Sequence, residues 1–149
     1  MAPSETPFAE ACIKCDGLCC KGPIFVSLCD IARLRAAGIA ATIKSDGAFR
    51  TLALRQGRCQ FLERDGCALP RSVRPLDCRV FPVVFVADST TRFFLSEKCP
   101  FLSSIPSSWV DTQRAVVLDE ISQWATEDVS AYSGHIRAAL AQGLLRPLK

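Results

Sequence analysis

The segment CIKCDGLCC (residues 12–20) places four cysteines within nine positions of the chain. Cys12 and Cys15 form a C-x-x-C pair followed by Asp16-Gly17, which is the form of a metal knuckle: two thiolates grip one ion, and the glycine allows unusual backbone angles beside them. A thioredoxin-like redox pair is the alternative, but such a pair should follow a strand, and nothing strand-like precedes Cys12.

The adjacent pair Cys19-Cys20 departs from simple zinc patterns. Neighbouring side chains usually diverge, so one tetrahedral ion does not easily take both thiolates. The pair indicates two ions or a multinuclear centre, or else one ligand beside one small buried thiol. A helix would place Cys12, Cys15 and Cys19 on one face, whereas Gly17 disfavours a regular helix, so helix and loop both stay open. The ferredoxin spacing C-x2-C-x2-C-x3-C-P is absent, which leaves an iron–sulfur cluster unproven and open.

The composition decides how the nine cysteines are interpreted. The 149 residues are 49% hydrophobic and 22% charged, which is typical of one folded domain. The first residues lack a basic start followed by an apolar run, and no stretch approaches the roughly 20 apolar residues of a membrane span. We therefore expect a cytoplasmic protein, where thiols stay reduced and serve as metal ligands or redox groups; a disulfide framework is the lesser alternative.

The charge pattern raises a nucleic-acid hypothesis. The formal net charge is +3, and seven arginines against three acidic residues lie between residues 50 and 79. However, eight metal-bound thiolates would add eight negative charges and two divalent ions would add four positive ones, which changes the net charge from +3 to −1. The arginines are then expected to balance the cluster, and nucleic-acid binding is disfavoured.

Residue patterns predict an α+β fold, a small cysteine-rich metal-binding domain with short hairpins and a C-terminal two-helix segment. Ser27 and Asp30 have near capping-box spacing, and Gly38 marks the end of that helix, with Cys29 in its first turn. The other expected features are an extended segment over 22–28, a linker over 39–48, hairpins turning at 56–57 and 65–66, irregular structure around Cys78, and a hairpin turning at 88–91.

The cysteine-free remainder predicts two helices that cover the cysteine-bearing half. Their apolar residues recur at helical spacing: Val110, Val117, Ile121 and Trp124 on one face, and Val129, Tyr132, Ile136 and Leu140 on another. Such residues are usually core, so we do not expect Trp124 or Tyr132 in a ligand site. The expected organisation is a flexible N-terminus (1–11) and a single metal-chelating domain (12–149), made of a cysteine-cluster half (12–104) and a helical tail (105–149).

Over residues 12 to 99 the sequence resembles a known family. The resemblance is to the bacterial YkgJ-type cysteine-cluster proteins, which are described as zinc- or iron-chelating. Their pattern consists of C-x2-C-x3-CC, C-x-F-L with a following cysteine, R-P-x-x-C-R-x-F-P and one more cysteine. This chain matches it with CIKCDGLCC (12–20), CQFLERDGCALPRSVRPLDCRVFP (59–82) and Cys99. The resemblance implies eight ligands: Cys12, Cys15, Cys19, Cys20, Cys59, Cys67, Cys78 and Cys99. Cys29 has no place in the pattern. Arg74 and Arg79 flank Cys78 and are candidates for neutralising the thiolate charge from behind the ligands.

The function that follows is chelation of zinc or iron, with an iron–sulfur cluster as one form. The alternative is an iron-dependent or redox enzyme, or an accessory protein to one. All-cysteine coordination favours the first, because catalytic zinc usually keeps an open position beside three protein ligands. The single histidine, His135, is expected to be an ordinary residue of the helix surface. No cofactor loop or catalytic triad motif accompanies the cysteines, and the sequence names no catalytic residue or protein partner.

Overall fold

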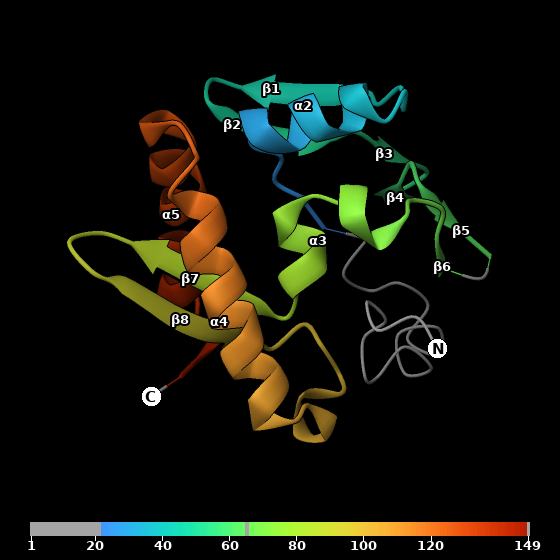
Figure 1. The fold of residues 1–149 in the computed structure, drawn as a ribbon. Coiled ribbons are helices and arrows are strands. Elements are labelled where there is room, and N and C mark those ends of the chain that lie inside the picture. Colours follow the sequence, from blue (N-terminus) through green and yellow to red (C-terminus); the bar gives the residue numbers. More distant parts are fainter. Residues whose placement is uncertain (1–21, 65, 149) are drawn as a thin grey trace.

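The computed structural model describes residues 22–64 and 66–148, and Cys12, Cys15, Cys19 and Cys20 lie outside this range. The prediction of an α+β fold is confirmed: helices and small antiparallel hairpins share the chain (Figure 1). The elements are α2 (Leu28–Ala36), β1 (Ile43–Asp46), β2 (Phe49–Leu52), β3 (Leu54–Arg55), β4 (Arg58–Cys59), β5 (Leu62–Glu63), β6 (Gly66–Cys67), η2 (Arg71–Val73), α3 (Leu76–Val80), β7 (Val83–Ala87), β8 (Thr91–Ser96), η3 (Leu102–Ser104), α4 (Ser107–Ile121), α5 (Thr126–Ala141) and β9 (Leu145–Pro147).

Helix α2 begins as its sequence predicts. The Ser27 side chain accepts from the Asp30 N–H at 3.0 Å, and the Asp30 carboxylate accepts from the Ser27 N–H at 2.9 Å, so both halves of the capping box are present. Asp30 is fully buried and its other oxygen accepts from the Leu76 N–H at 3.1 Å. One carboxylate therefore starts α2 and also fixes the beginning of α3.

The three small hairpins lie between α2 and α3. The predicted hairpins carrying Cys59 and Cys67 are confirmed as β3–β4 and β5–β6. The first turns at 56–57 as expected, whereas in the second Gly66 belongs to β6 and pairs with Glu63, so the expected turn at 65–66 is wrong by one residue. The expected linker over 39–48 is wrong, because β1 pairs there with β2 across a turn in which Gly47 has φ +61. Strand β1 is mostly exposed and carries no apolar alternation, so the signal of a half-buried strand is missing from its sequence.

Residue 78 lies in a helix rather than in the irregular structure that we expected. Pro75 is the N-cap of α3 and Pro82 follows its end, so the two prolines flank the helix without interrupting it. Proline is tolerated at the start of a helix because the first N–H groups have no partner inside the helix. The Leu76 N–H finds its partner in Asp30 instead.

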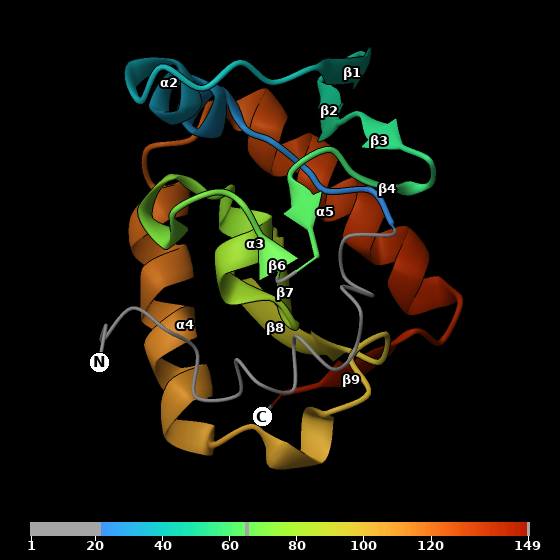
Figure 2. The same cartoon turned by 90° about the vertical axis from the view of Figure 1, so that its right-hand side faces the viewer.

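A three-stranded antiparallel sheet in the order β7-β8-β9 supports the C-terminal half. The predicted β7–β8 hairpin is confirmed, whereas β9 was not expected. Helices α4 and α5 both contact β7, and the Ala87 N–H donates to the Ser133 hydroxyl at 3.0 Å. Figure 2 shows the two helices on opposite sides of α3, with the sheet behind it.

Two separate apolar clusters hold these elements together. The large core contains fourteen buried residues, drawn from both the cysteine-bearing half and the helical tail: Phe25, Leu76, Val80, Val83, Val84, Phe85, Val86, Phe94, Leu95, Val110, Val117, Trp124, Tyr132 and Ile136. Within residues 22–64 and 66–148, the buried members of the small cluster are Ile24, Val26, Leu52 and Cys59. Trp124 and Tyr132 are therefore core residues, as predicted.

The extended segment 23–27 runs between the two clusters. Its side chains alternate: Ile24 and Val26 belong to the small cluster, and Phe25 belongs to the large core. Backbone bonds of 2.9 Å from Val26 N to Arg50 O and of 3.1 Å from Leu52 N to Ile24 O attach this segment to β2. No helix within the described residues is long and apolar enough to cross a membrane.

Candidate metal centre

Four of the eight cysteines in the pattern lie within the described residues, each on a different element. Cys59 ends β4, Cys67 ends β6, Cys78 lies within α3, and Cys99 follows β8. Cys59 is buried, with 5% of its surface exposed, and the other three are partly buried. Short hairpins thus present cysteines at their strand ends, as two-residue strands with tight turns allow.

Cys59 and Cys78 belong to the same apolar cluster. Cys59 is a buried member of the small cluster, and Cys78 packs against that cluster from α3 together with Phe61 and Leu62. Within residues 22–64 and 66–148, no three His, Cys, Asp or Glu side chains are grouped so as to hold a metal ion. What the described residues show is two thiols from separate elements in one apolar environment.

Cys29 lies in a different place. It packs against the large core, and its Sγ donates to the Gln123 carbonyl at 3.5 Å. Burial raises the pKa of the Cys29 thiol, and the nearby Glu120 carboxylate raises it further. A thiol with a raised pKa is a poorer metal ligand, since metals bind the thiolate.

Arg74 and Arg79 bind the backbone around Cys78 and a helix of the tail. Arg74 Nε donates to the Leu69 carbonyl at 2.9 Å, and Arg79 Nε donates to the Arg74 carbonyl at 3.0 Å. Arg79 also pairs with Glu120 of α4 at 2.9 Å. These contacts fix the loop that leads into α3; a further role of either arginine toward thiolates stays a prediction.

Glu120 links three helices through its two oxygens. It pairs with Arg79 of α3 and, at 2.7 Å, with Arg33 of α2. Burial acts to raise the pKa of Glu120, but the hydrogen bonds and charges of the two arginines outweigh it and lower that pKa. The carboxylate is therefore ionised at neutral pH and holds α3, the helix of Cys78, against α4.

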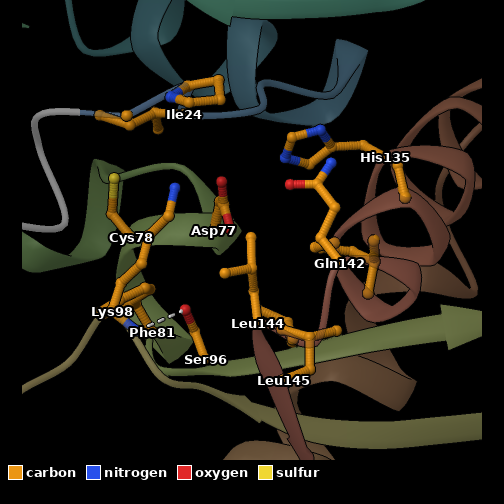
Figure 3. A pocket seen from close by; sticks show the side chains of 16 residues that line it. Ile24, Asp77, Cys78, Phe81, Ser96, Lys98, His135, Gln142, Leu144 and Leu145 are labelled. Atoms are coloured by element: carbon orange, nitrogen blue, oxygen red, sulfur yellow. Dashed lines mark hydrogen bonds between the residues drawn. The ribbon is translucent and has the colours of Figure 1, made fainter.

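A cavity of about 250 Å³ opens beside Cys78, and its polar residues were not found by sequence reasoning. Asp77, Lys98 and His135 line it with Cys78 (Figure 3). Asp77 and Lys98 each directly precede a cysteine of the pattern, which is the one signal that marked them in the sequence. His135 is not the ordinary surface residue that we expected: it is half-buried, and its ring lies 4.8 Å from the Phe49 ring.

The cavity changes the titration of two of its groups. Burial raises the pKa of the Asp77 carboxyl to about 6, and Asp30 adds to the rise, while the hydrogen bond from the Phe25 N–H and the charge of Lys98 oppose it. Burial also lowers the pKa of His135, and Lys98 lowers it further, so the imidazole is neutral at pH 7.

Comparison with known families bears on the cysteine pattern. A family model named CxxCxxCC and described as "Putative zinc- or iron-chelating domain" matches residues 11–104. The chain belongs to this family. The matched range contains all eight cysteines of the pattern and ends just before α4, so the family covers the hairpins, α3 and the β7–β8 hairpin but not the two long helices. Searches of curated proteins and of solved structures gave no significant match.

Proposed function

We propose that this protein chelates zinc or iron, as separate ions or as an iron–sulfur cluster, through eight cysteine thiolates. The ligands are Cys12, Cys15, Cys19, Cys20, Cys59, Cys67, Cys78 and Cys99. The observation that supports the proposal is that Cys59 and Cys78, from two separate elements, both belong to the small cluster within the family's matched range. The extended segment that follows Cys19-Cys20 contributes Ile24 and Val26 to this same cluster.

The donor set suits this chemistry. Thiolates are soft ligands that bind zinc, iron and iron–sulfur clusters, and one tetrahedral ion takes four of them. Eight thiolates therefore fit two four-coordinate ions or one multinuclear cluster. The reducing cytoplasm is the compartment that keeps such thiols available, and we place the protein there.

The metal has a structural task in this account. Among the described residues, the small cluster has four buried members with six partly buried residues packed against them, which is little apolar contact for ordering three short hairpins. Metal–thiolate bonds would supply the remaining free energy, because a site absent from the unfolded chain contributes its binding energy to folding. In this organisation residues 12–149 form one metal-chelating domain in which the tail, 105–149, supports the cysteine half.

Single cysteine substitutions test the proposal. Cys59→Ser and Cys78→Ser should each lower the metal content of protein purified without oxygen, measured by elemental analysis per chain. Cys29→Ser is the matched control: serine can still donate to the Gln123 carbonyl, so the fold and the metal content should stay at the wild-type values. Equal metal loss from all three variants would show that the ligand set is wrong.

A further inference from the structure

The cavity beside Cys78 has walls of two kinds. It lies between α3, the β7–β8–β9 sheet and α5, and Figure 3 shows Asp77, Cys78 and Lys98 on one side, facing His135 and Gln142 on the other. Ile24, Val84, Ile136 and Leu145 give it apolar surface. A concave site with an apolar lining and a few convergent polar groups is the usual form of a small-molecule site.

The cavity contains one carboxylate, Asp77, and one ammonium group, Lys98, which form no ion pair with each other. Asp77 accepts the Phe25 N–H through Oδ2 at 3.0 Å, and within the described part of the chain its Oδ1 accepts no hydrogen bond. Lys98 makes no ion pair with any residue that the structure describes, and its side chain lines the same cavity as Asp77. A Cβ at Gly22 would lie 3.1 Å from Lys98 Nζ, so the ammonium group reaches the rim where the chain enters.

A ligand that complements this arrangement must carry both charges. A simple carboxylate bound at Lys98 would leave the Asp77 carboxylate without a positive partner, and a simple amine bound at Asp77 would leave the Lys98 ammonium without a negative one. Burying a charge beside a like charge is costly, whereas a charge with an opposite partner and hydrogen bonds is tolerated. The neutral His135 and Gln142 add hydrogen-bonding groups without changing this balance.

The size of the cavity limits the ligand. A cavity of about 150 Å³ takes a benzene molecule, so one of about 250 Å³ has room for roughly ten non-hydrogen atoms. An amino acid with a medium-sized aliphatic side chain has this size, and the apolar wall formed by Ile24, Val84 and Ile136 suits such a side chain.

We propose that this cavity binds a free α-amino acid with an apolar side chain, its ammonium group at Asp77 and its carboxylate at Lys98. The side chain lies against the apolar wall. The inference does not depend on the identity of the metal, since none of these contacts uses a thiolate.

Titration calorimetry with three matched probes tests the inference on full-length protein purified without oxygen. L-leucine should bind, while 4-methylpentanoate, which lacks the amine, and 3-methylbutylamine, which lacks the carboxylate, should each bind at least about tenfold more weakly, as expected for loss of a charge-assisted contact. Lys98→Met and Asp77→Asn should each weaken leucine binding by a similar factor. Asparagine keeps an acceptor for the Phe25 N–H, so the fold should survive.

Lys44→Met and Asp46→Asn are the matched controls, because both residues are exposed on β1, away from the cavity. Both should bind leucine as wild type does, and elemental analysis of every variant separates loss of ligand binding from loss of metal. The inference is overturned if folded wild-type protein does not bind leucine at millimolar concentration, or if either analogue binds as tightly as leucine. If Asp77→Asn does not fold, the test relies on Lys98→Met, which should fold because Lys98 is exposed at the rim. Unchanged leucine affinity in Lys98→Met would also overturn the inference.

Discussion

The large core and the small cluster differ in what they need in order to be stable. The large core buries fourteen residues from the sheet, α3, α4, α5, the α4–α5 connection and the 23–27 segment. The ring centroid of Phe25 lies within 5.6 Å of the Phe49, Trp124 and Tyr132 ring centroids. The small cluster buries four residues, one of which is Cys59. Apolar burial is enough to explain the first, whereas the second includes Cys59 and has Cys78 packed against it.

If the proposed function is right, the chain divides its stability between apolar packing in the large core and metal bonds at the small cluster. Phe25 and its neighbours Ile24 and Val26 face opposite clusters, so the two regions share a single backbone segment. Perturbations of one cluster should therefore be separable from perturbations of the other, residue by residue.

Removal of the metal should have the largest effect, and it should be confined to one region. A structural zinc site contributes on the order of 10 kcal/mol to the folding of a small domain. We expect a chelator to abolish amide hydrogen-exchange protection in β3, β4, β5 and β6 while β7, β8 and α5 keep theirs. Uniform loss of protection across both regions would mean that the large core also depends on the metal.

Truncating one side chain in each cluster should have the second largest effect, and it should distinguish the two clusters by their effect on metal release. Phe25→Ala should lower the free energy of unfolding by about 3–5 kcal/mol, and Leu52→Ala by about 2–5 kcal/mol, because each leaves a cavity in packed surroundings. Only Leu52→Ala should speed the release of metal to a chelator, since only Leu52 lies in the small cluster. Denaturant unfolding and a chelator assay measure the two effects; faster metal release in Phe25→Ala would contradict the separation.

Loss of an ion pair that connects α5 to β2 and α2 should lower the free energy of unfolding by less than the core truncations do. Asp128 is fully buried, pairs with Arg50 at 2.6 Å and accepts the Leu28 N–H at 2.8 Å. Asp128→Asn keeps an acceptor but loses the charge, and should destabilise by about 1–3 kcal/mol, the usual worth of a hydrogen bond to a charged group. The control is Asp88→Asn, which removes exposed pairs with Arg92 and Arg137 and should cost about 1 kcal/mol or less in thermal unfolding.

An effect of similar size, but on metal retention, is expected at Arg79, which follows Cys78 in the chain. Arg79→Ala should weaken metal retention against a chelator by about 10- to 100-fold, the usual result of removing a partner that supports metal ligands. Arg55→Ala, on the exposed strand β3, should leave retention unchanged. Retention at the wild-type level in both variants would remove Arg79 from the account of the metal centre.

Glu120→Gln tells apart two ways in which Arg79 could act. This variant removes the ion pair that holds Arg79 to α4 but leaves the guanidinium in place. If Arg79 supports the thiolates by its charge, Glu120→Gln should retain metal better than Arg79→Ala does. Equal retention would mean that Arg79 acts only by positioning α3.

Local signals in the sequence predicted much of the fold. The Ser27–Asp30 box, the turns of the two cysteine-bearing hairpins and the helical spacing of Val117, Tyr132 and Ile136 each depend on residues close together in the chain. Strands β1 and β9 were not predicted because their sequences show no amphipathic pattern. Strand β1 is largely exposed, and β9 is a three-residue strand at the sheet edge that ends in Pro147. Helix α3 was not predicted because the prolines on either side of it suggest irregular structure.

The candidate site was predictable only where its residues follow a pattern. The eight cysteines came from the resemblance to the family, which depends on spacing along the chain. Asp77, Lys98 and His135 line one cavity only because α3, the end of β8 and α5 meet in space, and no local pattern encodes that meeting. Likewise, the arginines of the middle segment were expected to balance the thiolate charge, yet Arg50 and Arg79 pair with buried or half-buried carboxylates of the tail.

The metal content of the wild-type chain tests the central claim most directly. Protein purified gently and without oxygen should contain zinc or iron at about two ions per chain, or one multinuclear cluster, as eight thiolates allow. Elemental analysis per chain measures this, and colour separates the metals, because zinc–thiolate protein is colourless and iron–sulfur protein is brown. Metal-free protein whose cysteines are already joined in stable disulfides would contradict the account.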